Sequence, residues 1–487
     1  MDAKRRSVLL GGLAAAASVA GLTGGTAASA APVPGGRTGG GWPPLEFDGQ
    51  VLTDPASLSA AADDFGHIVH KTPAAVLRPA NSDDVKHAID LARQYHGKAA
   101  PQGQSHSVWG RSMTDSQGGV IDMSSLHSVG AVQNDRITVD AGAKWSEVLA
   151  VTLPAGKTPP VLCDYLELSV GGTIVVGGVG ATTSTYGVQS DNVISMEVVT
   201  GKGEKFTCSP TSRSDLFNAI RAGLGQVAVI TKVTLKLVAA PASTRRFQFF
   251  YPDLATMLTD ARFLSGNNRF DAVQGAILAP PTGGWAYRLD ATKFFTGTPP
   301  DDAALTAGLH DDPARRTATT STYFEWLNRL ATLEALLRSN GQWFNPHPWL
   351  TTFIGDSRVQ AVVTDEVNRT NAATDLGQFG QIVLSPLKKS AITSPLLRKP
   401  SDNLFYAFNF VRVPATADVN NANRLVELNK ATYARVRNAG GTLYPVSAFP
   451  MSRTDWRNHF GSSFNLLDAA KNRYDPNDLL TPGYEVF

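Results

Sequence analysis

A histidine lies in a short polar loop near the start of the chain, in the stretch PQGQSHSVWG of residues 101–110. Gly103 can form a turn, and Gln104 and Ser105 lead directly into His106. A neutral imidazole nitrogen can act as a nucleophile, a base or a hydrogen-bonding group, so this loop is a candidate cofactor or catalytic site. A histidine in such a loop can also cap the turn, face solvent or fill the core, and the rest of the chain must decide between these roles.

A glycine-rich stretch, DYLELSVGGTIVVGGVGATTSTYG, occupies residues 164–187. Glycine lets the backbone approach a ligand closely and leaves N–H groups free for phosphate oxygens. The stretch lacks the GxGxxG pattern that opens a helix in the Rossmann fold. A dinucleotide bound here would therefore be held by another fold, and a run of turns between strands is the alternative explanation.

The first thirty residues are typical of an export signal. Arg5 and Arg6 precede an apolar, alanine-rich run that ends in the small-residue pattern Ala28-Ser29-Ala30. Paired arginines favour the twin-arginine route, which carries folded proteins. An N-terminal membrane anchor is the alternative, but Gly and Thr interrupt the run and it is short for a membrane span. We therefore predict a signal peptide over residues 1–30 and a secreted, extracytoplasmic protein.

Composition and charge narrow the class of protein. The chain has 487 residues, of which 43% are hydrophobic and 18% charged, so we expect a globular protein of two or more domains. Without the three basic and one acidic residues of the signal peptide the formal net charge is zero, which gives no support for nucleic-acid binding. Two cysteines, Cys163 and Cys208, exclude a disulfide framework and leave a single bridge open. No HExxH or CxxC spacing is present, so no metal site is predicted.

The elements that must position these residues follow from the hydrophobic pattern, which predicts an α+β protein. Helices are expected at 81–97, where Asn81 or Ser82 can cap the first turn, and at 145–153. Strands are expected at 74–79, 118–126, 136–143 and 226–238, with a hairpin at 194–208 that turns at Gly201 to Gly203. From about residue 241 the pattern changes to helices, such as 322–339, that alternate with strands, such as 404–413. A Gly/Pro-rich linker is expected at 31–50, and the C-terminal tail is expected to form a helix and then a Pro/Gly turn.

Five motifs occur in one order along the chain: GQSHS, DYLELSVGGT, RAGLGQVAVIT, NPHPWL and the ending LLTPGYEVF. In these motifs the chain resembles the cytokinin dehydrogenases, flavoproteins of the vanillyl-alcohol-oxidase-like group with a PCMH-type FAD-binding domain. The resemblance begins near residue 60 and covers nearly all of the remaining chain. It implies a two-part FAD-binding domain, residues 51–240 plus the tail 441–487. An inserted α+β substrate domain at 241–440, built on an antiparallel sheet, would cover the isoalloxazine ring.

The resemblance also assigns roles to residues. The histidine of the family's G-x-G-H-S motif is bonded covalently to the flavin 8α-methyl carbon, and His106 matches it, although Ser105 replaces the preceding glycine. Asp164 matches the aspartate of the D-Y-L-x-L motif, which accepts a hydrogen bond from the substrate N–H and helps to draw off the proton. We expect Asp164 to be a buried carboxylate beside the flavin, and a turn or N-cap aspartate is the alternative. The resemblance implies FAD contacts at Gly103, Gln104, Ser105, His106, Ser107, Arg111, Asp164, Ser169, Gly171, Gly172, Thr173, Val175, Val179, Ile230, Thr481 and Tyr484.

Three positions near the expected substrate differ from the family pattern or do not match its spacing. A family glutamate that pairs with a substrate nitrogen is replaced by Gln274, which can donate and accept but cannot offset a positive charge. A family tryptophan near the substrate side chain is replaced by Ile392. Cys163 lies beside Asp164, but its spacing from the Gly-Gly pair does not fit relatives with a second, cysteine-linked flavin bond.

The resemblance implies an FAD-dependent oxidoreductase with Asp164 and Gln274 at its catalytic site. It would take a hydride from the carbon next to a secondary amine, so that an N6-isoprenoid adenine gives adenine and an aldehyde. The predicted partners are a small-molecule substrate and an electron acceptor, either O2 or a quinone, with no nucleic acid and no membrane span. Two alternatives stay open: a covalent-flavin oxidase of a sugar, alditol or secondary metabolite, and a flavin-binding protein without turnover.

Overall fold

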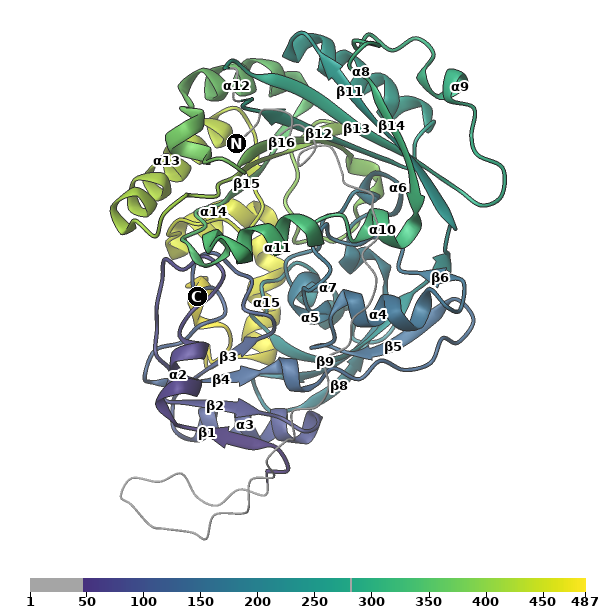
Figure 1. The fold of residues 1–487 in the computed structure, drawn as a ribbon. Coiled ribbons are helices and arrows are strands. Elements are labelled where there is room, and N and C mark those ends of the chain that lie inside the picture. The colour runs from purple at the N-terminus through teal and green to yellow at the C-terminus, as the bar shows by residue number, and fades with distance from the viewer. Residues whose placement is uncertain (1–46, 281–282) are drawn as a thin grey trace. The chain divides into compact units, whose positions relative to one another are not determined.

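The computed structural model describes residues 47–280 and 283–487. The predicted signal peptide and most of the predicted linker lie outside the described residues. The described chain mixes helices with parallel and antiparallel strands, so the α+β prediction is confirmed (Figure 1).

The first sheet carries the histidine loop at the end of a strand. Its strand order is β1-β2-β4-β3, and β2, β4 and β3 run parallel while β1 is antiparallel to β2. Helix α3 begins as predicted, because the Asn81 side chain accepts hydrogen bonds from the backbone N–H groups of Asp83 and Asp84. Strand β3 was not predicted from its sequence KAAPQ, and the loop with His106 follows it directly. The bounds are β1 (Gln50–Leu52), β2 (Ala75–Arg78), α3 (Ser82–Gln94), β3 (Lys98–Gln102) and β4 (Gly118–Asp122).

The second sheet is antiparallel and has the order β5-β9-β7-β8. The predicted hairpin is confirmed as β7 and β8, joined by a turn that contains Gly201 and Gly203. The glycine-rich stretch contains two short helices, α5 and α6. The bounds are β5 (Arg136–Asp140), α4 (Trp145–Thr152), α5 (Val170–Ile174), α6 (Thr183–Tyr186), β7 (Val193–Thr200), β8 (Lys205–Cys208), α7 (Ser214–Ile220) and β9 (Ala228–Lys236).

The third sheet has eight antiparallel strands in the order β14-β11-β13-β12-β16-β17-β15-β18. Helices α8, α12 and α13 pack on one face of it, as Figure 1 shows. Strand β17 is buried along most of its length because both faces of the sheet are covered there. The bounds are β11 (Ser243–Tyr251), α8 (Leu254–Asn267), β12 (Ala272–Leu278), β13 (Ala286–Phe295), β14 (Thr317–Thr322), β15 (Leu350–Gly355), α12 (Asp356–Arg369), β16 (Gln381–Lys388), β17 (Leu404–Val411), α13 (Val419–Asn438) and β18 (Thr442–Leu443).

The helix predicted over 322–339 is two helices, α10 (Tyr323–Leu327) and α11 (Ala331–Ser339). The break has a packing cause: Trp326 is buried and its indole N–H donates to Thr292 of the sheet, whereas Leu333 and Leu337 of α11 line a cavity. The two apolar faces point to different parts of the molecule, so the backbone turns between them. Figure 1 shows α11 on the side of the large sheet away from α12 and α13.

The C-terminal tail returns to the first sheet after α14 (Arg453–Phe460) and α15 (Phe464–Tyr474). The backbone of Ala99 in β3 bonds the tail twice, donating to the Leu479 carbonyl and accepting from the Thr481 N–H, each at 2.9 Å. The buried ammonium of Lys471 supports this arrangement through Asp475 at 2.7 Å. The tail therefore lies beside the N-terminal sheet, and the exact domain boundaries stay a prediction.

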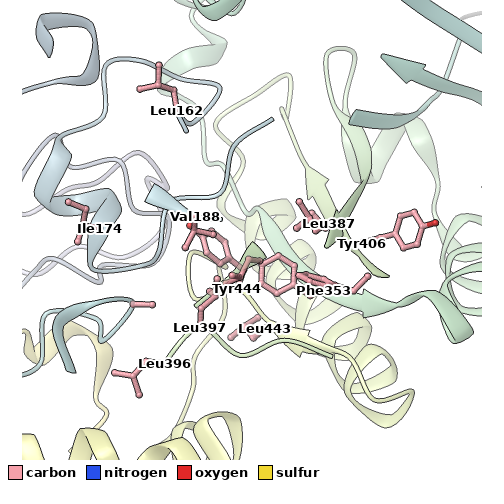
Figure 2. Packing of buried hydrophobic residues seen from close by; sticks show 14 of the residues in the cluster. Leu162, Ile174, Val188, Phe353, Leu387, Leu396, Leu397, Tyr406, Leu443 and Tyr444 are labelled. Atoms are coloured by element: carbon pink, nitrogen blue, oxygen red, sulfur yellow. The ribbon is translucent and has the colours of Figure 1, made fainter. Parts of the chain in front are cut away.

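One large apolar core joins residues of the second sheet to residues of the eight-stranded sheet. Figure 2 shows Val188 beside Tyr444 in the middle of this core, with Ile174 at the left and Phe353 to the right; the rings of Phe353 and Tyr444 are 5.6 Å apart. Such continuous packing holds the two sheets in fixed positions relative to each other, and with them the side chains that line any cavity between them. Within residues 47–280 and 283–487, no helix combines the length and apolarity needed to span a membrane.

Candidate active site

A cavity of about 520 Å³ is lined by loops of the first two sheets and by strands of the eight-stranded sheet. This volume is in the usual range for cofactor and substrate sites. Helix α11 contributes Leu333, Glu334 and Leu337 to its wall. Every residue predicted to contact FAD, together with Gln274, lines this one cavity: Gly103, Gln104, Ser105, His106, Ser107, Arg111, Asp164, Ser169, Gly171, Gly172, Thr173, Val175, Val179, Ile230, Gln274, Thr481 and Tyr484. The structure thus brings them together, and their individual roles stay predictions.

The histidine loop is fixed by residues that precede it by about forty positions. The N–H of Phe65 donates to the Ser105 carbonyl at 2.8 Å, and that of Gly66 donates to the Ser107 carbonyl at 3.1 Å. Ser105 has a φ of 50°, in the left-handed region that favours glycine. This backbone conformation gives a physical reason for the glycine that the family pattern has there.

The imidazole of His106 lies among aromatic rings. It stacks on Phe65 with ring centroids 4.0 Å apart, and Tyr165 lies on its other side at 4.9 Å. Burial lowers the pKa of His106 to about 3, with His347 and Arg338 acting in the same direction, so the ring is neutral at physiological pH. A neutral ring nitrogen is the form that can act as a nucleophile.

His347 of the NPHPWL motif stacks on the opposite face of Phe65, at 4.1 Å. Its Nδ1 lies 3.1 Å from the Phe65 carbonyl and donates to it, because a carbonyl only accepts. Burial lowers the pKa of His347 to about 4, so Nε2 carries no proton. Among the described residues this buried Nε2 has no hydrogen-bond partner. The motif was recognised in the sequence, but this role in the cavity wall was not predicted.

The Asp164 carboxylate is bound by two side chains that are distant in sequence. The Nη2 of Arg329 donates to Oδ1 at 2.5 Å, and the Nε2 of Gln274 donates to Oδ2 at 2.9 Å. The same Nη2 donates to the Oε1 of Gln274 at 2.9 Å, which closes a triangle. Asp164 is therefore beside Gln274 as the resemblance implies. It is not buried as expected, since its side chain is 41% exposed and ion-paired.

Tyr165 and Glu334 form a second contact that sequence reasoning missed. The Tyr165 hydroxyl donates to Glu334 Oε1 at 2.8 Å, and Arg338 donates to the same oxygen at 2.8 Å. Burial, and then the Glu334 carboxylate, raise the pKa of Tyr165, so the phenol stays protonated. Adjacent residues of the DYLEL motif thus contact the segment 329–338 twice.

Both cysteines are free, so the bridge that the sequence left open does not form. Cys163 lines the cavity, and burial raises the pKa of its thiol to about 12. A protonated thiol is a poor nucleophile, which argues against a second attachment point there. Ile392 is 4% exposed and packs in the core, and it is not among the described residues that line the cavity. Its expected place beside the substrate is therefore not observed.

The glycines at the cavity allow two loops to pack against each other. A Cβ on Gly103 would lie 2.2 Å from Ser169 Oγ, and one on Gly171 would lie 2.9 Å from the Cβ of Ala141. These positions therefore need glycine for close contact within the protein, in addition to any approach to a ligand.

The cavity suits a flavin dinucleotide. Its lining includes residues 103–107, Ser169, residues 171–173 and the apolar residues Val175, Val179 and Ile230. The buried guanidinium of Arg111 donates to the Phe449 carbonyl at 2.9 Å and the Gly483 carbonyl at 3.4 Å. Its Nε is buried and has no hydrogen-bond partner among the described residues, although Arg111 itself lines the cavity.

Comparisons with known proteins agree with this geometry. Residues 73–209 match the family model described as an FAD binding domain, and residues 303–487 match "Cytokinin dehydrogenase 1, FAD and cytokinin binding". An uncharacterised oxidoreductase, ORF5 of the fasciation locus of Rhodococcoides fascians, is 38% identical over 435 residues, covering 89% of this chain and 98% of that protein. Cytokinin dehydrogenase 3 of Arabidopsis thaliana is 30% identical over 489 residues, covering 91% of each chain.

Among solved structures, 6-hydroxy-D-nicotine oxidase of Arthrobacter nicotinovorans has a TM-score of 0.71 at 19% identity, covering 91% of this chain and 99% of that chain. This similarity supports the fold. Fold, cavity and matches together define an FAD-dependent oxidoreductase with a flavin-binding part and a second, substrate-binding part. The chain belongs to the cytokinin dehydrogenase-like family of these enzymes.

Proposed function

We propose that this enzyme oxidises the C–H bond next to a secondary amine, with an N6-isoprenoid adenine as substrate and adenine plus an unsaturated aldehyde as products. The observation that carries the proposal is the Asp164 carboxylate, hydrogen-bonded to Gln274, in the same cavity as the His106 loop. An acceptor for a substrate N–H is what this reaction needs, because a proton must leave the nitrogen while a hydride leaves the carbon.

Flavin, when bound, supplies the hydride acceptor. Asp164 accepts the substrate N–H: each carboxylate oxygen has two lone pairs, so Oδ1 and Oδ2 each keep one after bonding Arg329 and Gln274. The second N–H of the Gln274 amide is free to bond a substrate acceptor. Leu333, Leu337 and Trp343 give this end of the cavity an apolar wall that excludes water. The imine that results is split by water into the two products.

We propose in addition that FAD is attached covalently through His106. The neutral, stacked imidazole at the cavity wall supports this. Acid precipitation tests it: the yellow colour should stay with the protein, and His106→Ala should release the flavin to the supernatant or fail to bind it. Full release of flavin from the unmutated protein by acid would contradict the attachment.

An anaerobic reduction assay tests the substrate. Isopentenyladenine should bleach the flavin of the purified holoenzyme, with adenine as the product. Bleaching by a polyol or a phenolic compound, with none by isopentenyladenine, would instead identify a related oxidase. A bound flavin that no compound reduces would identify a binding protein without turnover.

We also propose that the protein is exported through the twin-arginine route, with FAD loaded before export. The motive is the pair Arg5 and Arg6 in the predicted signal, followed by a chain that must fold around a cofactor.

A further inference from the structure

The acidic residues that line the cavity are all paired with arginines of one segment. Two described carboxylates line it, those of Asp164 and Glu334. Arg329 pairs with Asp164 at 2.5 Å, and Arg338 pairs with Glu334 at 2.8 Å. Both arginines belong to the stretch that includes the break between α10 and α11. The substrate end of the cavity therefore has acidic groups but no unpaired negative charge.

Arg329 lies behind this end of the cavity and is held there by several contacts. It does not line the cavity itself, whereas Asp164 and Gln274 do. Its Nη1 donates to the Trp326 carbonyl at 3.1 Å, and its guanidinium lies over the Trp326 ring at 4.9 Å from the centroid. Its side chain is only 17% exposed, so its charge is weakly screened by solvent.

The triangle with Asp164 fixes the orientation of the Gln274 amide. A guanidinium only donates and a carboxylate only accepts, so the Gln274 carbonyl must face Arg329 and its NH2 must face Asp164. Without Arg329 nothing in the triangle would hold the amide oxygen in place. Arg329 thus positions a group that it shares with the cavity.

The triangle also sets the local charge. Asp164 contributes one negative charge, Arg329 one positive charge and Gln274 none, so the group is neutral. The pKa values of His106 and His347, lowered by burial to about 3 and about 4, leave both rings uncharged as well. Among the described residues, Arg111 is the remaining cation of the wall, and it donates to the carbonyl of Gly483 in the tail. Among the described residues that line the substrate end, no carboxylate without an arginine partner is left to offset the charge of a protonated amine.

We propose that Arg329 is a positioning residue that sets the charge preference of the enzyme. It keeps the substrate end neutral, so that the site takes an uncharged N–H, as in an aromatic amine, and rejects a protonated aliphatic amine. The inference rests on the proposed oxidation of amines. Removing the charge of Arg329, about 5 Å from a bound ammonium group at an effective dielectric constant of about 20, changes the dissociation constant of that cation by roughly a hundredfold. Partial screening by solvent reduces the change to roughly tenfold.

The test compares two amines of similar shape, N-isopentenylaniline, which is neutral at pH 7, and N-isopentenylcyclohexylamine, which is protonated. Each is titrated anaerobically into the holoenzyme, and the dissociation constant is taken from the change in the flavin spectrum on binding. Arg329→Met and Gln274→Glu both change the site charge by −1, by different means. Arg329→Lys keeps the charge and removes the planar fork.

In the unmutated enzyme the cation should bind far more weakly than the neutral amine. The dissociation constant of the cyclohexylamine divided by that of the aniline should fall by roughly ten- to a hundredfold in both Arg329→Met and Gln274→Glu. Arg329→Lys should keep this ratio close to that of the unmutated enzyme. A ratio unchanged within about twofold in either variant would overturn the inference, as would equal binding of both amines, or no binding of the neutral amine, by the unmutated enzyme. If Arg329→Met does not fold, Gln274→Glu decides alone.

The outcome is separable from that of the proposed function. Dissociation constants are measured without turnover, so the charge preference is tested even if neither amine reduces the flavin. Reduction of the flavin by isopentenyladenine is a separate measurement on the same preparation.

Discussion

Asp64 offers a sharp test of how the histidine loop is held. It is 3% exposed, and its carboxylate accepts from the Ser107 hydroxyl at 2.6 Å and the N–H groups of Gly110 at 2.7 Å and Gly66 at 3.0 Å. Two of these donors, Ser107 and Gly110, belong to the loop that carries His106. Asp64 therefore organises the loop that carries the proposed flavin attachment.

The charge on Asp64 is costly in the folded protein. Burial raises its pKa from 3.8 to about 6, although the three hydrogen bonds act in the opposite direction. The difference corresponds to about 3 kcal/mol. Because the pKa of Asp64 is higher in the folded protein, its protonated carboxyl favours the folded state. This contribution to the free energy of unfolding is fully present below pH 3.8 and is lost as the pH rises through 6.

Asp64→Asn removes the titration and keeps the size of the side chain. Relative to the unmutated holoenzyme, the variant should gain about 2.4 kcal/mol between pH 4 and pH 7, because a small part of the effect is already present at pH 4. The substitution also rearranges hydrogen bonds, but the free energy this costs is the same at both pH values and therefore does not affect the difference between them. For a chain of this length we expect about 1–2 °C in melting temperature per kcal/mol, so the difference in melting temperature between variant and unmutated protein should change by about 2–5 °C.

The assay is thermal melting of both holoproteins, followed by flavin fluorescence, at pH 4 and pH 7. Asp115→Asn, at an exposed turn beyond the same loop, is the matched control for loss of one negative charge. Asp64→Ala should also lower flavin content, because it leaves the Ser107 hydroxyl and the Gly110 N–H unpaired at about 1–3 kcal/mol each. A melting difference between Asp64→Asn and the unmutated protein that stays constant over this pH range would refute the reasoning.

Three further predictions follow from other parts of the molecule. Asp164→Ala should keep the flavin content and slow flavin reduction, measured by rapid mixing, by about 10²–10⁴-fold. If the carboxylate draws off the proton, Asp164→Asn should slow flavin reduction nearly as much. An unchanged rate of reduction would remove Asp164 from the mechanism. Lys471→Met should cost about 3–5 kcal/mol, measured by melting, because the fully buried Asp475 carboxylate loses its positive partner and keeps only backbone N–H donors; an unaltered melting temperature would contradict this. Arg5→Lys with Arg6→Lys should trap a flavin-loaded precursor in the cytoplasm in a cell-fractionation assay, and export of a flavin-free, unfolded chain would disprove the proposed route.

The sequence by itself determined the local elements and the family. Helix α3 was predictable because its cap Asn81 and its apolar spacing are encoded within a few consecutive residues. The hairpin of β7 and β8 was predictable for the same reason, since strand pattern and turn glycines are adjacent. The order of five motifs identified the family, and with it the loop of His106 and the carboxylate of Asp164.

Only the tertiary structure decided what surrounds those two residues. Arg329 lies 165 positions after Asp164, and Ser107 lies 43 positions after Asp64, and no local pattern links either pair. The break between α10 and α11 also depends on Trp326 reaching the sheet and Leu337 reaching the cavity. Local propensity acts over one or two helical turns, whereas the charge and hydrogen bonding of this site arise from packing that brings distant segments together.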